Sequence, residues 1–186
     1  MVQPDEINKK LETIVLGGGC FWCLEAVYKN FKFICKIEPG YAGGHFVSPT
    51  YEEVCKGQTG HAEVVRITFD SSSISLEEML YIFFLIHDPT TVNAQGMDIG
   101  SQYRSIILPS TLDQMKRAFA VKKKIEEEKI WSLPIVTEFK MLEQFYPAEF
   151  EHQNYYELHH EAAYCRAVIA PKVLNARKKF FRFLKN

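Results

Sequence analysis

The chain has 186 residues, which is enough for one domain with a buried core, so we expect residues 1–186 to form a single domain. Its 22 Lys and Arg residues balance 23 Asp and Glu residues, and charge therefore gives no reason to expect nucleic acid or an anionic membrane as a partner. No apolar stretch approaches the ~20 residues of a membrane span, and residues 1–10 lack the apolar core of a signal peptide. We therefore expect a cytoplasmic protein whose partners are small molecules or peptides, and whose five cysteines are thiols or redox groups.

The sequence predicts a succession of strands and helices without a regular strand-helix-strand repeat. In chain order we expect a strand over 12–16, a helix over 21–31 and a strand over 34–44 that runs into a glycine loop. A short helix over 49–57, capped by Thr50, and a strand over 62–70 follow. The next element is an apolar helix that begins at a capping box of Ser75 and Glu78 and stops before Pro89. After a long loop over 88–102 we expect a strand over 103–108, a helix over 111–129, a strand over 135–142, and mostly helical structure from Ala148 to a basic C-terminal helix. This pattern is typical of an α+β fold, in which helices pack on a mainly antiparallel or mixed sheet.

The stretch GGGCFWCLEA, residues 17–26, places a thiol where the first strand turns into the first helix. The three glycines let the backbone turn tightly, because glycine takes positive φ without a steric penalty. A helix N-terminus favours an anion through its free N–H groups and its dipole, so we expect this position to lower the pKa of Cys20 and to make it a nucleophile. The alternative is that Cys20 is a small apolar residue of the core.

A carboxyl group shares the apolar face of the strand predicted over 62–70. Alternation puts Glu63 on the same side as Val65, Ile67 and Phe69. Removal from water disfavours the charged form, so the pKa of Glu63 is expected to rise and the group becomes a candidate acid near neutral pH. Strand twist that brings Glu63 to solvent or to an arginine is the alternative.

The other polar candidates are less specific when each is considered alone. Tyr51 and Tyr103 follow the two long loops and are typical half-buried packing tyrosines. Asp98 fits a turn cap or a partner for Arg104.

In combination, these residues lie in motifs that resemble the A-type peptide methionine sulfoxide reductases, and the resemblance extends over about residues 13–180. The motifs are GGCFW around Cys20, GYAGG at 40–44, PTYEEVCKGQTGHAEVV from Pro49, HDPTT from His87, DIGSQYRS from Asp98, and FYPAE with HQNYY towards the C-terminus. That family reduces the S epimer of methionine sulfoxide, free or in proteins, and has an α+β fold related to the ferredoxin-like two-layer sandwich. The resemblance implies a single catalytic domain that repairs oxidised proteins under oxidative stress, works as a monomer and needs no cofactor or metal.

The resemblance also implies a role for each candidate. It makes Cys20 the nucleophile and Glu63 the acid that protonates the departing oxygen. Tyr51 and Tyr103 match phenols that hydrogen-bond that oxygen. The remaining matches are Phe21 and Trp22, an aromatic wall for the substrate methyl group, and Asp98, an acidic residue near the bound substrate.

Recycling of the enzyme requires a second thiol, because attack leaves a sulfenic acid that a thiol converts to a disulfide for an external dithiol such as thioredoxin to reduce. Cys23 lies about one helical turn from Cys20, and Cys165, in the C-terminal tail and helix over 160–186, matches the tail cysteine of the family. We favour Cys165, which would need a mobile tail, and expect Cys35 and Cys55 to be buried thiols. Residues 1–10 are expected to form a flexible tail.

Two other functions are compatible with parts of the sequence. The C-x-x-C pattern after a strand is typical of thioredoxin-like disulfide oxidoreductases, but such a function leaves Glu63 and the long loops unexplained. A zinc-stabilised or peptide-binding module is the non-enzymatic alternative, although no second C-x-x-C is present to complete a zinc site.

Overall fold

The computed structural model describes residues 10–185, and nearly all of the tail predicted over 1–10 lies outside the described residues. The strands are β1 (Leu11–Gly17), β2 (Ile34–Ala42), β3 (Ala62–Asp70), β4 (Ala94–Gln95), β5 (Asp98–Ile99), β6 (Ile106–Leu108), β7 (Glu138–Phe139) and β8 (Phe145–Pro147). The helices are α1 (Phe21–Tyr28), α2 (Tyr51–Cys55), α3 (Leu76–Ile86), α4 (Leu112–Glu127), α5 (Tyr155–Leu158) and α6 (Ala170–Lys179). Short 3₁₀ turns form at Ser101–Tyr103, Phe150–His152 and Phe181–Phe183, and a π-helical turn at Cys165–Ile169.

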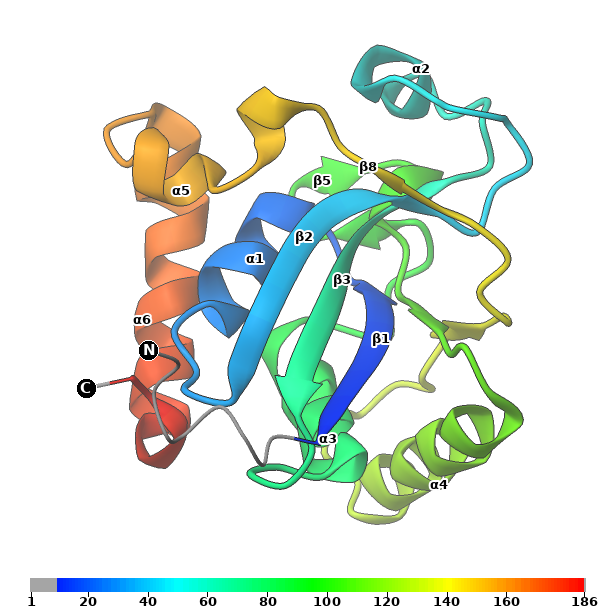
Figure 1. Cartoon of the computed structure of the whole chain (residues 1–186), viewed down its shortest axis with the longest axis vertical. Coiled ribbons are helices and arrows are strands. Elements are labelled where there is room, and N and C mark those ends of the chain that lie inside the picture. The colour runs from blue at the N-terminus through cyan, green and yellow to red at the C-terminus, as the bar shows by residue number, and fades with distance from the viewer. Residues whose placement is uncertain (1–9, 186) are drawn as a thin grey trace, which may run out of the picture.

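The main sheet has the strand order β7-β6-β1-β3-β2-β8 and is mixed, because β6 and β7 are parallel while the other neighbours are antiparallel. Its central part, β6-β1-β3-β2, is built by the chain segment β1, α1, β2, β3, α3, β6. Helices α1 and α3 lie on one face of these strands, with α6 beside α1 and α4 beside α3 (Figure 1). The architecture confirms the predicted α+β class and the ferredoxin-like two-layer sandwich.

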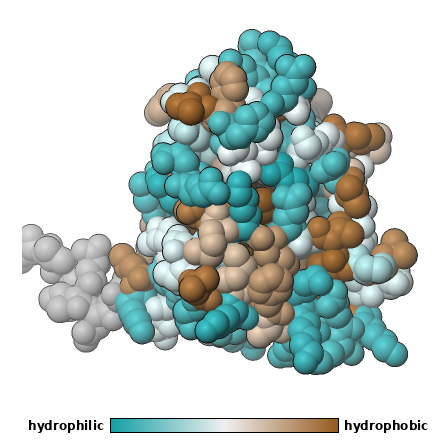
Figure 2. Space-filling model, turned by 90° about the vertical axis from the view of Figure 1, so that its right-hand side faces the viewer, coloured by the Kyte–Doolittle hydropathy of each residue, from teal (hydrophilic) through white to brown (hydrophobic). Residues whose placement is uncertain are grey.

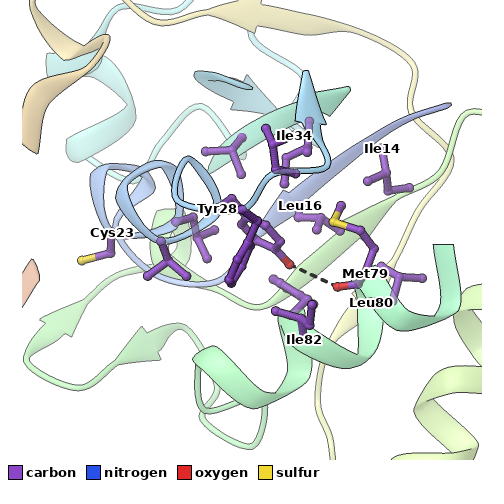
Figure 3. Packing of buried hydrophobic residues seen from close by; sticks show 14 of the residues in the cluster. Ile14, Leu16, Cys23, Tyr28, Ile34, Met79, Leu80 and Ile82 are labelled. Atoms are coloured by element: carbon purple, nitrogen blue, oxygen red, sulfur yellow. Dashed lines mark hydrogen bonds between the residues drawn. The ribbon is translucent and has the colours of Figure 1, made fainter. Parts of the chain in front are cut away.

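Alternation along β3 separates two apolar clusters on the two faces of the sheet. Val65, Ile67 and Phe69 belong to the larger cluster under α1 and α3, whereas Val64 belongs to a smaller cluster on the other face. Figure 3 shows part of the larger cluster, where Tyr28 of α1 donates a hydrogen bond to the carbonyl oxygen of Met79 in α3 at 3.3 Å. Because β3 is a central strand, every side chain on its core face is removed from water.

Local sequence signals explain where the helices begin. Thr50 and Ser75 each form a capping box, in which the hydroxyl accepts from the backbone N–H of a glutamate three residues later and that glutamate accepts in return. Thr111 caps α4 in the same position without the reciprocal bond. These three starts confirm the helices predicted from sequence.

The structure differs from the sequence prediction at the edge of the sheet. The strand predicted over 135–142 is reduced to β7, because β6 is only three residues long and offers partners to Glu138 and Phe139 alone. The strand predicted over 103–108 starts at Ile106, since the preceding residues form a 3₁₀ turn. The loop predicted over 88–102 contains the small hairpin β4–β5.

The surface in Figure 2 carries hydrophobic residues in separate groups among hydrophilic ones. Over residues 10–185 no helix combines the length and the apolar composition that a membrane span requires.

Candidate active site

Cys20 lies at the corner between β1 and α1, as the sequence predicted. Gly19 turns the chain there with φ of 89°, and a Cβ atom at this position would lie 2.5 Å from Gln95 Cγ, so only glycine fits. The backbone N–H of Gly19 bonds to the carbonyl oxygen of Tyr103 at 3.1 Å, which ties the corner to the 3₁₀ turn. Cys20 is the N-cap of α1, and its side chain makes no capping hydrogen bond to the helix.

Glu63 lies beside this corner and is only 1% exposed. It pairs with Tyr41 in the register of β2 and β3, and its Oε2 accepts a hydrogen bond of 3.0 Å from the backbone N–H of Phe21. Burial raises the pKa of Glu63 to about 8, although the bond from Phe21 opposes the rise. The carboxyl group is therefore mostly protonated at pH 7, in agreement with the sequence expectation for this face of the strand.

The pKa of Cys20 does not follow the sequence prediction. Cys20 is 5% exposed, and its burial, followed by the neighbouring Cys23 and then Glu63, raises the pKa of its thiol well above the usual value. The predicted lowering at the helix N-terminus is therefore wrong for this buried thiol, because loss of water disfavours its charged form. The pKa of Cys23 is instead lowered, first by its interaction with Cys20 and then, against its own burial, by the charge of Lys172.

Tyr51 and Tyr103 are both half-buried, and each lies close enough to Glu63 for that carboxyl group to affect its pKa. Burial raises the pKa of each phenol, and the charge of Glu63 is the next cause in both cases. Both hydroxyl groups thus stay protonated at physiological pH and remain hydrogen-bond donors. The structure brings together four of the residues predicted to act in catalysis: Cys20, Glu63, Tyr51 and Tyr103.

An aromatic cluster surrounds Trp22 at the start of α1. Tyr155 stacks on the indole with centroids 3.7 Å apart and an interplanar angle of 8°, and Phe21, Tyr51 and His152 lie between 5.6 and 6.2 Å from it. Trp22 Nε1 and His152 Nδ1 are buried without a hydrogen-bond partner among the described residues. Buried polar atoms are normally paired, so these two mark a place where a polar ligand would be stabilised.

Asp98 is connected to the thiols through Tyr164, a residue that the sequence analysis did not single out. The Tyr164 hydroxyl donates to Asp98 Oδ2 at 2.8 Å, and its ring lies edge-on to Trp22 at 6.1 Å. Tyr164 also acts on the neighbouring Cys20 and Cys23 side chains and favours their ionised forms, which for Cys20 opposes the larger effect of burial on the pKa. The C-terminal segment therefore supplies part of the site.

Glu149 is a second residue that the sequence analysis did not assign, although it belongs to the FYPAE motif. Its Oε1 accepts from the backbone N–H of Tyr51 and its Oε2 accepts from the Tyr41 hydroxyl, both at 2.8 Å. One carboxylate thus joins the first residue of α2 to β2, the strand paired with Glu63. His152, three residues later, lies over the Tyr51 ring with centroids 4.2 Å apart.

The remaining cysteines differ in their surroundings. Cys165 is fully buried at the start of the π-helical turn, which packs against α1. Burial raises the pKa of its thiol, and the charge of Cys23 adds to the rise. Cys35 and Cys55 are exposed, so the prediction that they are buried thiols is wrong.

Comparisons with known proteins agree with the motifs. Residues 12–183 match the family described as peptide methionine sulfoxide reductase. The peptide methionine sulfoxide reductase MsrA of Granulibacter bethesdensis is 54% identical over 168 residues, which cover 90% of this chain and 91% of that protein. Among solved structures, reduced Mxr1 from Saccharomyces cerevisiae superposes with a TM-score of 0.78 and 34% identity over 84% of this chain and 90% of that one. Mxr1 in complex with Trx2 superposes with a TM-score of 0.56 and 26% identity, over 78% and 85% of the two chains.

These matches extend over the strands and helices that carry Cys20 and Glu63. They decide against the thioredoxin-like enzyme and the zinc or peptide-binding module. The chain belongs to the peptide methionine sulfoxide reductase family.

Proposed function

We propose that this protein reduces the S epimer of methionine sulfoxide, free or in oxidised proteins, to methionine, with Cys20 as the nucleophile and Glu63 as the acid. The observation that carries the proposal is a carboxyl group with a pKa of about 8 beside a buried thiol. A sulfoxide sulfur is a poor electrophile until its oxygen is protonated or strongly hydrogen-bonded. A neutral acid next to a thiol supplies the proton for the oxygen and the nucleophile for the sulfur.

In the chemical step, Cys20 Sγ attacks the sulfoxide sulfur while Glu63 donates a proton to the oxygen. The oxygen ends on Cys20 as a sulfenic acid, the substrate sulfur is reduced to a thioether, and the thiol proton replaces the one that Glu63 gave. Since Cys20 is a neutral thiol at rest, no charged group has to be carried into the buried site before attack.

The other site residues are assigned roles that fit their positions. Tyr51 and Tyr103 donate hydrogen bonds to the departing oxygen, and each such donor is worth ~3 kcal/mol in comparable sites. Phe21 and Trp22 hold the terminal methyl group of the substrate. Asp98 orders the site through its hydrogen bond from Tyr164 and lies near the substrate main chain.

For the resolving thiol we propose Cys23, which differs from the sequence preference for Cys165. The support is proximity and acidity: Cys23 lies in the first turn of α1, its backbone N–H bonds to the Cys20 carbonyl oxygen at 3.0 Å, and the pKa of its thiol is lowered. Its thiol condenses with the sulfenic acid to a disulfide and one water molecule. Cys165 lies against α1 and would act only after Cys23. We propose thioredoxin or a similar dithiol as the external reductant, because a related structure holds Mxr1 bound to Trx2.

The same proposal covers the setting of the enzyme. One chain supplies every residue assigned to the site, which supports a single catalytic domain acting as a monomer. Its odd number of cysteines supports a reducing compartment, the cytoplasm, and a role in repairing proteins after oxidative stress.

The activity can be tested with the two separated epimers of a methionine sulfoxide substrate and dithiothreitol. The purified protein should reduce the S epimer alone, and Cys20→Ser should lose that activity because no thiol remains to accept the oxygen. Reduction of the R epimer, or undiminished turnover by folded Cys20→Ser, would contradict the assignment.

Glu63 should act in its protonated form. Its raised pKa keeps the proton up to about pH 8, so the single-turnover rate of methionine formation should fall as the pH rises through that value. Glu63→Gln should lower the rate on the order of 100-fold and remove the fall near pH 8. Rapid-quench measurement between pH 6 and pH 10 would show both effects, and an unchanged descending limb in Glu63→Gln would rule out this acid.

Glu149 should act through Tyr51, as a positioning residue. Glu149→Ala removes both 2.8 Å hydrogen bonds and should lower kcat by about 10-fold, whereas Glu149→Gln retains an acceptor for the Tyr51 N–H and should keep most of the activity. In a Tyr51→Phe background Glu149→Ala should have less than about a 2-fold further effect. The exposed Glu143→Gln is the matched control, and equal losses in both backgrounds would show that Glu149 only stabilises the fold.

The first disulfide should join Cys20 and Cys23. After one turnover without reductant, peptide mapping should find this bond in the wild type and in Cys165→Ser alike. Cys23→Ser should still release one equivalent of methionine but stop recycling with thioredoxin. A bond between Cys20 and Cys165 in the wild type would restore Cys165 as the direct resolving residue.

A further inference from the structure

Met97 is the most exposed large apolar side chain among the described residues, at 92%. Met79 is fully buried in α3, and Met115 and Met141 are partly buried. A thioether in water is readily oxidised to a sulfoxide, and access to the oxidant decides which methionine in a folded protein reacts first. The proposed function does not use Met97.

The hairpin β4–β5 presents Met97 at its tip. Gly96 takes φ of 62°, and a Cβ atom built there would meet no heavy atom within 4 Å, so the turn stands in open space. Backbone pairing of Gln95 with Asp98 closes the turn, and the Gln95 side chain bonds to the backbone of Asp88 at 3.0 and 3.1 Å. The tip is thus a fixed protrusion with an accessible thioether.

The same hairpin holds Met97 outside its own active site. The Asp98 side chain turns inward, to the Tyr164 hydroxyl beside Cys20, while its neighbours Met97 and Ile99 are 92% and 81% exposed. Asp98 and Ile99 are successive residues of β5, so their side chains point to opposite sides, and Met97 precedes the strand in the exposed turn. Met97 thus lies on the solvent side of a hairpin whose next residue, Asp98, is held to Tyr164.

We propose that Met97 is a site of oxidation by peroxide and that its sulfoxide is a substrate for a second copy of this enzyme. Peroxide transfers one oxygen atom to the Met97 sulfur and leaves water. Cys20 of the second copy then takes that oxygen as a sulfenic acid and returns the thioether, and a dithiol reduces the enzyme. The inference rests on the proposed function.

Oxidation of Met97 would change the rim of the site, by which we mean the hairpin tip next to Asp98, since Met97 directly precedes Asp98. A flexible apolar side chain becomes a polar one next to the hydrogen bond from Tyr164. Repair between copies would restore the rim after exposure to peroxide, in proportion to the fraction of enzyme molecules that remain active.

The test begins with Cys20→Ser, which cannot repair itself. This variant is treated with hydrogen peroxide, the peroxide is removed, and peptide mass spectrometry follows the sulfoxide at Met79, Met97, Met115 and Met141. Met97 should be oxidised first. A catalytic amount of wild-type enzyme with dithiothreitol should then lower the Met97 sulfoxide to about half, because peroxide forms both epimers of the sulfoxide and this enzyme reduces only the S epimer. Added Cys20→Ser should leave it unchanged, and Met97→Leu should keep its activity on free methionine sulfoxide.

A concentration series distinguishes repair between copies from repair within one chain. Oxidised wild-type enzyme with dithiothreitol should recover Met97 faster as its concentration rises, and a half-time independent of concentration would overturn the proposal. Oxidation of Met115 or Met141 ahead of Met97 would also overturn it. If the Met97 sulfoxide persists while the same enzyme reduces free methionine sulfoxide, only this inference fails; if neither is reduced, the proposed function fails with it.

Discussion

Burial of the Glu63 carboxyl group is the constraint on which the rest of the site depends. Glu63 stands on a central strand with Tyr41 paired beside it, and one backbone N–H, that of Phe21, is its hydrogen-bond donor. A charge there would have little compensation, so the site favours the protonated acid at neutral pH. Burial in the sheet raises the pKa of Glu63, and the hydrogen bond from the Phe21 N–H holds the start of α1 against the carboxyl group. This one bond therefore connects the packing of the helix on the sheet to the acid of the site.

The two thiols at the start of α1 have pKa values that are shifted in opposite directions. Burial keeps Cys20 neutral, while Cys23, beside Cys20 and influenced by Lys172, is the more acidic thiol. A neutral Cys20 thiol carries the proton that returns to Glu63 after Glu63 has protonated the oxygen of the sulfoxide. A more acidic Cys23 suits the next step, because a larger fraction of that thiol is the nucleophilic thiolate when the sulfenic acid forms. The position of the two cysteines on one helical turn thus orders the two steps.

Much of this could be predicted from local sequence. Alternation placed Glu63 on the apolar face, and short capping motifs located the starts of α2 and α3. Residues that enter the site from distant segments could not be found this way: Tyr164 reaches Asp98 across 66 residues, and Glu149 reaches Tyr51 across 98. The direction of the pKa shift of Cys20 could not be predicted from local sequence either, because the helix end is a local feature whereas burial depends on the whole fold. The motifs FYPAE and HQNYY indicated the region without indicating the contacts.

The most direct test of this account is the pKa of Glu63 in the resting enzyme, measured from the carboxyl signal by infrared difference spectroscopy or by carbon NMR with labelled glutamate. Glu63→Gln identifies the signal. The account predicts titration near pH 8. A value in the ordinary glutamate range, about 4 to 5, would mean that the carboxyl is ionised when substrate binds, and it would contradict the assignment of Glu63 as the proton donor.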